Sequence, residues 1–261
     1  MKASLAFHLR LFVLVWLPTP CISFLGSPAV ASSSDWLGPV AVAASRDGGT
    51  LFVANSDARQ IAVVNTADRK VVGSIEMPAE PTALALSADG GRLYVACAAP
   101  KSTVCVVDTA SRKVVKSLPA GHTASGLALT PDGRRLYVCN RFDNDVSVID
   151  LKSGEEIARV PVAREPVGAV ATPDGGSVFV INHLPLDRTT SADVAAVVTV
   201  IDTGADAVAT AIRLPSGSSS VRGVCRERLG ELPTICAVAD VCRPELLVEI
   251  EGIAFSRRST G

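Results

Sequence analysis

Short apolar runs separated by polar turns recur along most of the chain. The first two runs of residues 79–119 flank Asp89-Gly90, which favours a tight turn because glycine tolerates a positive φ and aspartate bonds the turn backbone. In Ala83-Leu84-Ala85-Leu86 small and large apolar residues alternate and neither face is polar, so both faces of the sheet are expected to be covered. The runs of this segment predict four strands, at Pro81–Leu86, Leu93–Cys97, Val104–Asp108 and Lys113–Leu118.

The four-strand pattern occurs four times, with 42 or 43 residues between successive turn aspartates, which are Asp47, Asp89, Asp132 and Asp174. Repeats of about 40–45 residues with two apolar faces predict an all-β fold, a β-propeller of four-stranded blades. Four blades are complete, and the repeats that predict them cover residues 37–78, 79–119, 120–161 and 162–215.

A partial fifth blade is predicted to start at residues 216–225. The expected turn and second strand do not follow it, and residues 226–261 form an atypical C-terminal tail. Two interpretations stay open. The chain is a truncated or frame-shifted part of a longer propeller, which we favour because a ring leaves no blade face unpaired, or the tail closes a four-bladed ring.

Specific motifs accompany the second and third strands of the repeats. Leu51-Phe52-Val53-Ala54-Asn55 and Leu136-Tyr137-Val138-Cys139-Asn140 are each followed by a run such as Val148-Ile149-Asp150. These motifs resemble those of YVTN-repeat (YncE-like) β-propeller proteins, from residue 37 to about 225. The resemblance implies an exported propeller, usually of seven blades. Some members of that family are fused to or partnered with c-type cytochromes and other redox proteins.

The N-terminus predicts an export signal. Lys2 and Arg10 flank the start of the chain, and the apolar core Leu11–Leu17 is shorter than the about 20 residues that span a bilayer. Because Ala29-Val30-Ala31 is typical of a signal-peptidase site, we expect residues 1–31 to be removed. The mature protein would be periplasmic or extracellular, with no membrane span. Lipoprotein processing at Cys21 and an uncleaved anchor are the alternatives.

Composition narrows the function classes. The chain is 48% hydrophobic and 20% charged with a net charge of -1, which argues against a disordered protein and against nucleic acid as a partner. It contains no Cys-x-x-Cys-His haem motif, no Gly-x-Ser-x-Gly elbow and no phosphate-binding Gly-Lys-Ser/Thr loop. We therefore assign no cofactor and no catalytic residue.

The candidate binding face of the propeller is the one on which the turns between strands two and three lie beside the links between blades. Repeat four carries an insertion of about ten residues there, from His183 to Ala195, and loops on a rigid scaffold often carry function. The candidate ligand or partner residues on this face are Asp57, Arg59, Glu80, His122, Arg141, Asp143, Asp145, Glu165, His183, Asp187 and Arg188.

Three recurrent residue types receive structural interpretations. His122 and His183 with a nearby carboxylate would suit zinc, but no ligand spacing supports it, so no metal is predicted. Asparagines at the end of strand two, such as Asn140, indicate bonds to the turn backbone. We interpret the cysteines of the repeats as small buried residues. A bridge between Cys97 and Cys105 requires that both lie on one face of the sheet.

Two functions compete on this evidence. We predict that the protein is an exported propeller that acts as a binding or scaffold module for an unidentified protein or small ligand. We favour this function over that of an enzyme. The alternative is a redox-associated or lactonase-like propeller enzyme or subunit that uses the axial channel. In that case a cytochrome or another redox protein is the candidate partner.

Overall fold

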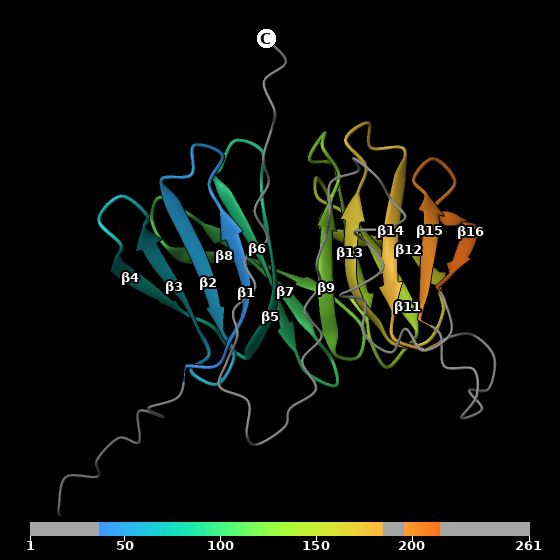
Figure 1. Ribbon diagram of the computed structural model, residues 1–261, viewed down its shortest axis with the longest axis horizontal. Helices are drawn as coiled ribbons and strands as arrows, with labels where there is room; N and C mark the ends of the chain where they lie inside the picture. The colour runs from blue at the N-terminus through green and yellow to red at the C-terminus, as the bar shows by residue number, and fades with distance from the viewer. Residues whose placement is uncertain (1–36, 185–195, 215–261) are drawn as a thin grey trace, which may run out of the picture. The chain divides into compact units, whose positions relative to one another are not determined.

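The computed structural model describes residues 37–184 and 196–214, and every regular element in these two ranges is a β-strand (Figure 1). The strands form four antiparallel four-stranded sheets, each built from strands that are consecutive in the chain. We call these sheets blades 1 to 4. The prediction of an all-β propeller fold with four complete blades is confirmed. The predicted signal, the start of a fifth blade, the tail, Asp187 and Arg188 lie outside the described residues.

The strands of each blade follow the predicted order. Blade 1 consists of β1 (Pro39–Ala44), β2 (Thr50–Asn55), β3 (Gln60–Asn65) and β4 (Lys70–Glu76). Blade 2 consists of β5 (Glu80–Leu86), β6 (Arg92–Ala98), β7 (Thr103–Asp108) and β8 (Lys113–Pro119). Blade 3 consists of β9 (Ala124–Leu129), β10 (Arg135–Asn140), β11 (Asp145–Asp150) and β12 (Glu155–Pro161). Blade 4 consists of β13 (Pro166–Ala171), β14 (Ser177–Asn182), β15 (Val197–Asp202) and β16 (Ala207–Arg213).

The Asp-Gly turn between the first and second strands has one construction in every blade. In blade 2 the Asp89 carboxylate accepts hydrogen bonds from the Ser87 hydroxyl (2.5 Å) and the Gly91 amide (2.9 Å), while Gly90 has a φ of 73°. Glycine is required at this position because its φ lies in the left-handed region. These local bonds explain why the turns were recognisable in the sequence.

The hydrophobic cores lie between blades, because side chains of one strand alternate between two neighbouring sheets. In β6, Leu93, Val95 and Cys97 pack against blade 1, while Tyr94 and Ala96 pack against blade 3. A third core of the same kind joins blades 3 and 4. The two-faced apolar pattern of the sequence therefore corresponds to a stack of sheets, each covered by its neighbours.

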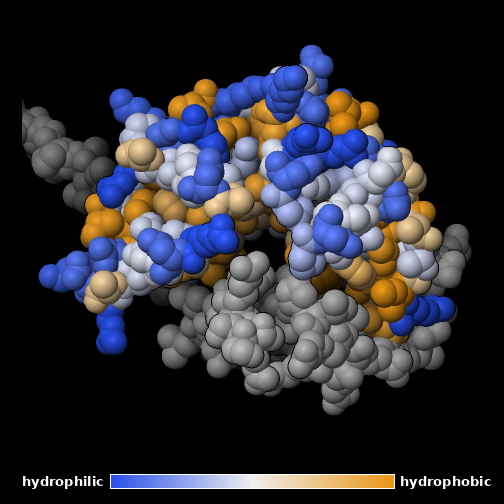
Figure 2. Space-filling view, turned by 90° about the horizontal axis from the view of Figure 1, so that it is seen from above, coloured by the Kyte–Doolittle hydropathy of each residue, from blue (hydrophilic) through white to orange (hydrophobic). Residues whose placement is uncertain are grey.

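The prediction that neighbouring sheets cover both faces of each blade is wrong for the fourth strand of each blade. All seven residues of β16 are exposed, and the exposed fractions of Val71 in β4 and Val115 in β8 are 67% and 54%. Hydrophobic surface is visible among the hydrophilic groups in Figure 2. The contacts between blades are concentrated on the first strands, β1, β5, β9 and β13. The fourth strands lie farther from the neighbouring sheet, so their side chains are left exposed.

The first strands of neighbouring blades are joined by a repeated hydrogen bond. The Thr82 hydroxyl donates to the Ala124 carbonyl (2.6 Å), and the equivalent Ser125 hydroxyl donates to the Pro166 carbonyl (2.7 Å). Beside the second bond, a Cβ atom on Gly126 would lie 2.7 Å from the Cα of Gly168. Blades 3 and 4 therefore approach more closely than any side chain at Gly126 permits. Among the described residues no helix has the length and apolar character to cross a membrane.

Candidate binding site on the loop face

The loop face carries the β2–β3, β6–β7 and β10–β11 loops together with the links between blades. Backbone bonds fix this arrangement in blade 3, where the Arg141 amide donates to the Thr123 carbonyl (3.1 Å) and the Val162 amide donates to the Asn144 carbonyl (3.0 Å). The β10–β11 loop therefore lies between the link that enters blade 3 and the link that leaves it. This is the face that the sequence predicted to carry the candidate residues.

A buried asparagine at the end of β10, Asn140, holds the β10–β11 loop in place through its hydrogen bonds. Asn140 is fully buried, accepts a hydrogen bond from the Gly121 amide (2.8 Å) and donates to Asp145 Oδ1 and Ser147 Oγ (2.7 Å each). In blade 4 the equivalent Asn182 donates to the Ala163 carbonyl (2.6 Å). Their recurrence indicated a structural role in bonding the turn backbone, and the backbone groups that they bond belong instead to the preceding blade links, at Gly121 and Ala163.

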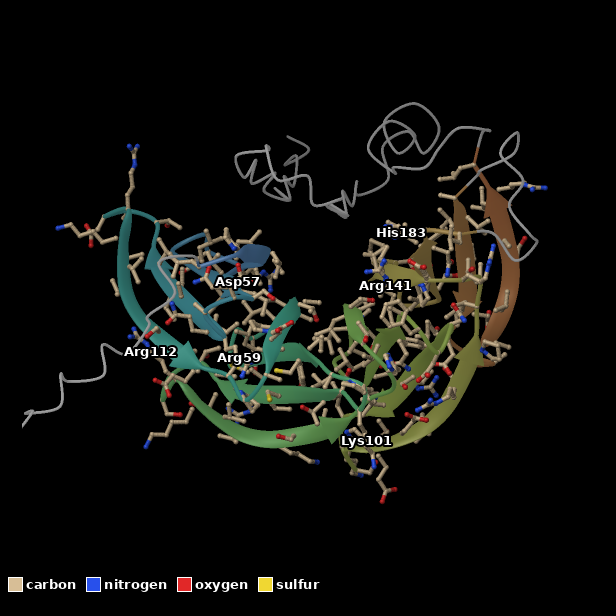
Figure 3. All side chains as sticks on the ribbon, turned by 90° about the horizontal axis from the view of Figure 1, so that it is seen from below. Asp57, Arg59, Lys101, Arg112, Arg141 and His183 are labelled. Carbon is tan, nitrogen blue, oxygen red and sulfur yellow. The ribbon has the colours of Figure 1, made fainter. Side chains whose placement is uncertain are left out.

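Five side chains of the loop face form a continuous row across the junction of blades 3 and 4. We call the row the loop-face cluster, and its members are His122, Phe142, Arg141, Glu165 and His183. The Arg141 guanidinium donates to Glu165 Oε2 from Nη2 (2.8 Å) and Nε (3.2 Å), and His183 Nδ1 lies 3.7 Å from the same oxygen. Figure 3 shows Arg141 and His183 next to each other at this junction.

The aromatic end of the cluster is open to solvent. The Phe142 ring centroid lies 5.3 Å from that of His122 in an edge-to-face arrangement, and Arg141 Cζ lies 5.2 Å from the Phe142 centroid. Phe142 is nevertheless 54% exposed. An exposed aromatic ring held between a cation and an imidazole presents apolar area at low entropic cost, because its neighbours already restrict its rotamers.

The charge state of the cluster is set by partial burial. Burial lowers the pKa of His183, and the positive charge of Arg141 lowers it further, while the Glu165 carboxylate acts in the opposite direction. The imidazole is therefore neutral near pH 7. The cluster thus combines one Arg-Glu ion pair, two imidazoles and one exposed aromatic ring. Arginine and aromatic side chains are the residue types enriched where proteins bind one another.

Two of the predicted acids have structural partners. Asp143 accepts a hydrogen bond from the His122 amide (2.8 Å), and the Arg159 guanidinium lies 3.5 Å from both Asp143 and Asp145. Burial raises the pKa of Asp145, against the effect of its hydrogen bond from Asn140 and of the Arg159 charge. Asp143 and Asp145 therefore hold the base of the loop, close to the cluster but outside its row.

The remaining predicted residues lie on other blades. Asp57 and Arg59 lie in the β2–β3 loop of blade 1, and Glu80 begins β5 of blade 2, all three exposed. Figure 3 shows Asp57 and Arg59 apart from Arg141 and His183. The structure thus brings together four of the nine predicted residues that it describes, His122, Arg141, Glu165 and His183, in one row. In residues 37–184 and 196–214 no three metal-binding side chains gather at one point.

Sequence reasoning gave no role to Phe142 and missed Arg159. Phe142 had a detectable signal, because a phenylalanine inside the polar run from Arg141 to Asp145 is unusual for a solvated loop. Arg159 lies in β12 between Ala158 and Val160 and had none. Its ion pairs depend on the pairing of β12 with β11.

The opposite face, which carries the Asp-Gly turns, has hollows between blades. One of about 460 Å³ lies between blades 3 and 4 and is lined by residues that include Asp132, Arg135 and Asp174. Another, of about 340 Å³, lies between blades 1 and 2. The hollow between blades 3 and 4 is bordered by a bond within a turn, from Thr130 to Asp132 (2.6 Å), and by a bond between blades, from Arg135 to the Thr203 carbonyl (2.5 Å). The exposed aromatic ring beside an ion pair is on the other face, so we place the candidate site on the loop face.

Comparisons with known proteins agree with the architecture. No protein-family model matches the chain, and no curated protein matches it. Among solved structures, hydrazine synthase of Kuenenia stuttgartiensis, which contains a β-propeller, is similar with a TM-score of 0.62 and 26% sequence identity. The match covers 72% of this chain and 53% of that one, so this chain spans about half the length of its structural neighbour. The described part of this chain therefore consists of four blades of a β-propeller.

Proposed function

We propose that this protein is an exported β-propeller that binds a partner protein through the loop-face cluster and has no catalytic activity of its own. The observation that carries the proposal is the exposure of Phe142, 54%, inside a row of ordered polar side chains. A partner surface would bury this ring, and buried aromatic side chains contribute a large share of the binding energy at protein interfaces.

Support for export comes from the N-terminal pattern, and the periplasm or the extracellular space is the proposed location. The YVTN-type motifs support the same proposal, because they resemble those of exported propellers. The blades supply a rigid support, since buried asparagines and backbone bonds hold the cluster residues. A preorganised surface loses little conformational entropy on binding.

A propeller subunit of a larger redox enzyme is the second candidate function. The name of the structural neighbour, hydrazine synthase, is that of an enzyme, and the YVTN-type family includes propellers partnered with cytochromes. In this version the protein bound at the loop face is a cytochrome or another redox protein. The two candidates share one surface and differ in the identity of the partner.

Site-specific photocross-linking tests the shared surface. A photoreactive residue is placed at Phe142, and a matched control is placed at Arg134 on the opposite face, where the side chain is 83% exposed. In cells that express the full chain, we expect one discrete adduct from position 142, lost in an Arg141→Ala background, and none from position 134. Identical adducts from both positions, or none from 142, would overturn the proposal. A haem-containing adduct would favour the redox subunit.

A further inference from the structure

In three blades, the side chain of a residue at the end of the second strand lies in direct contact with the side chain of a residue in the third strand. In blade 3, Asn140 Nδ2 donates to Ser147 Oγ (2.7 Å), and in blade 4 Thr199 Oγ1 donates to Asn182 Oδ1 (2.8 Å). In blade 2 the equivalent residues are Cys97 and Cys105, and both polar partners are replaced together. The blade 2 pair occupies a place that holds a direct side-chain hydrogen bond in blades 3 and 4.

The two cysteines lie on one face of the sheet, which is the condition that a bridge between them requires. Cys97 pairs with Thr103 and Cys105 with Val95, so the cysteines are diagonal neighbours on the same face of blade 2. Their Sγ atoms lie 3.7 Å apart and both side chains are fully buried. The third cysteine in residues 37–184 and 196–214, Cys139, belongs to the core between blades 3 and 4 and has neither of the other two as a neighbour.

We propose that Cys97 and Cys105 are a dithiol–disulfide couple, oxidised during folding by a protein or low-molecular-weight disulfide. The Cys105 thiolate attacks the oxidant disulfide, which forms a mixed disulfide and releases one thiolate. Cys97, as its thiolate, then attacks the Cys105 sulfur, which forms the Cys97–Cys105 bond and releases the second thiolate. The two cysteines lose two protons and two electrons, and the oxidant is reduced to two thiols.

The environment distinguishes the two thiols. The hydrogen bond between them raises the pKa of Cys97, which donates, and lowers that of Cys105, which accepts. The Ser117 and Thr103 hydroxyls lower the pKa of Cys105 further, against the effect of burial. The groups that bond Cys105 all belong to blade 2, so these hydrogen bonds do not depend on the docking of blade 1. Because the thiolate is the attacking species, Cys105 is the first nucleophile and Cys97 completes the exchange.

The register determines when the bond forms. A disulfide needs the sulfurs about 2.05 Å apart, and diagonal residues of an antiparallel pair have Cα atoms about 7–8 Å apart, so the β6–β7 hairpin must tighten. The folded state resists this because Phe52 and Ile61 of blade 1 pack on the same face. We therefore expect oxidation to be fast while blade 1 is undocked and slow in the folded, reduced protein.

Peptide mapping tests the bond directly. The full chain is reduced, unfolded, refolded in a glutathione redox buffer, alkylated, denatured and digested with trypsin. Lys101 lies between the two cysteines, so residues 93–101 and 102–112 are separate peptides that stay joined only by the disulfide. We expect the joined peptide, two hydrogens lighter than its parts, with Cys139 alkylated. Recovery of both peptides alkylated, or joined to other cysteines of the chain, would overturn the proposal.

A matched variant links the bond to stability. Cys97→Asn with Cys105→Ser recreates the pair found in blade 3 and so preserves a contact at this place. In wild type, the unfolding equilibrium constant should rise roughly tenfold when a reductant is added, because the closed loop restricts the unfolded chain. The double variant should show no such rise. A rise of equal size in both proteins would assign the effect to other cysteines.

Discussion

Tyr137 of blade 3 donates a hydrogen bond to Asp206 of blade 4, with 2.7 Å between Oη and Oδ1. Asp206 also accepts from Arg135 Nη1 (2.9 Å) and has a φ of 48°, in the left-handed region. Two side chains of one blade thus hold the β15–β16 turn of the next. Burial and this bond raise the pKa of Tyr137 to about 12, so the hydroxyl stays protonated and continues to donate at neutral pH.

Tyr137→Phe should destabilise the protein by roughly 1.5–3 kcal/mol, the range for a hydrogen bond to a charged group. The measurement is urea unfolding followed by circular dichroism. Tyr94→Phe is the control, because the Tyr94 hydroxyl has no hydrogen-bond partner among the described residues. Equal losses in the two variants would show that the bond to Asp206 contributes nothing specific.

His183 should make stability depend on pH below neutrality. Because burial lowers its folded-state pKa, the unfolded chain takes up a proton first as the pH falls, so stability is full above the unfolded value of about 6.5 and declines below it. His183→Gln should remove this part of the decline between pH 7.5 and 5. Chemical denaturation across that range is the measurement, with His122→Gln as the control. Parallel profiles for wild type and His183→Gln would refute the prediction.

Gly126→Ala should be severely destabilising. The added Cβ would lie 2.7 Å from the backbone of Gly168, so blades 3 and 4 would have to separate. A loss of roughly 1–3 kcal/mol is expected for overpacking of this kind. Gly91→Ala is the matched control, because its Cβ would meet Asp89 at 3.5 Å, an ordinary contact. Thermal unfolding of the two variants is the measurement. If Gly126→Ala were as stable as wild type, the close approach of blades 3 and 4 at this position would be contradicted.

Thr82→Val should weaken the junction of blades 2 and 3. The variant keeps the shape of the side chain but cannot donate to the Ala124 carbonyl, and the expected loss is about 1 kcal/mol. The equivalent positions of blades 1 and 4 are already valines, Val40 and Val167, so the fold accepts this side chain. Thr82→Ser should retain most of the stability. If valine and serine behave alike in denaturant unfolding, the hydroxyl has no role.

The exported protein should begin at Ser32. The apolar core and Ala29-Val30-Ala31 predict cleavage after Ala31, which N-terminal sequencing of the secreted or periplasmic material would detect. Ala31→Phe should block processing, because signal peptidase requires a small residue there. Full-length protein found only in the cytoplasm would contradict the prediction.

The repeat, the strands and their order could be predicted from the amino-acid sequence. Each depends on short-range physics: the Asp-Gly turns close on their own backbone, and short apolar runs bounded by such turns form strands of six or seven residues. The exposure of Val71 and Val115 on the outer strands of blades 1 and 2 was not foreseen, because the one-dimensional pattern says nothing about how sheets diverge away from their first strands.

The tertiary structure alone decided which candidate residues meet. Arg141 and Glu165 are 24 residues apart, and His183 is a further 18 along, directly after the second strand of the next blade. Their contact depends on how two sheets pack. The Cys97–Cys105 contact needed the register of β6 on β7, since a shift of one residue would place the two sulfurs on opposite faces. Local sequence fixes neither relationship, because the first arises from packing between two blades and the second from the pairing of two neighbouring strands.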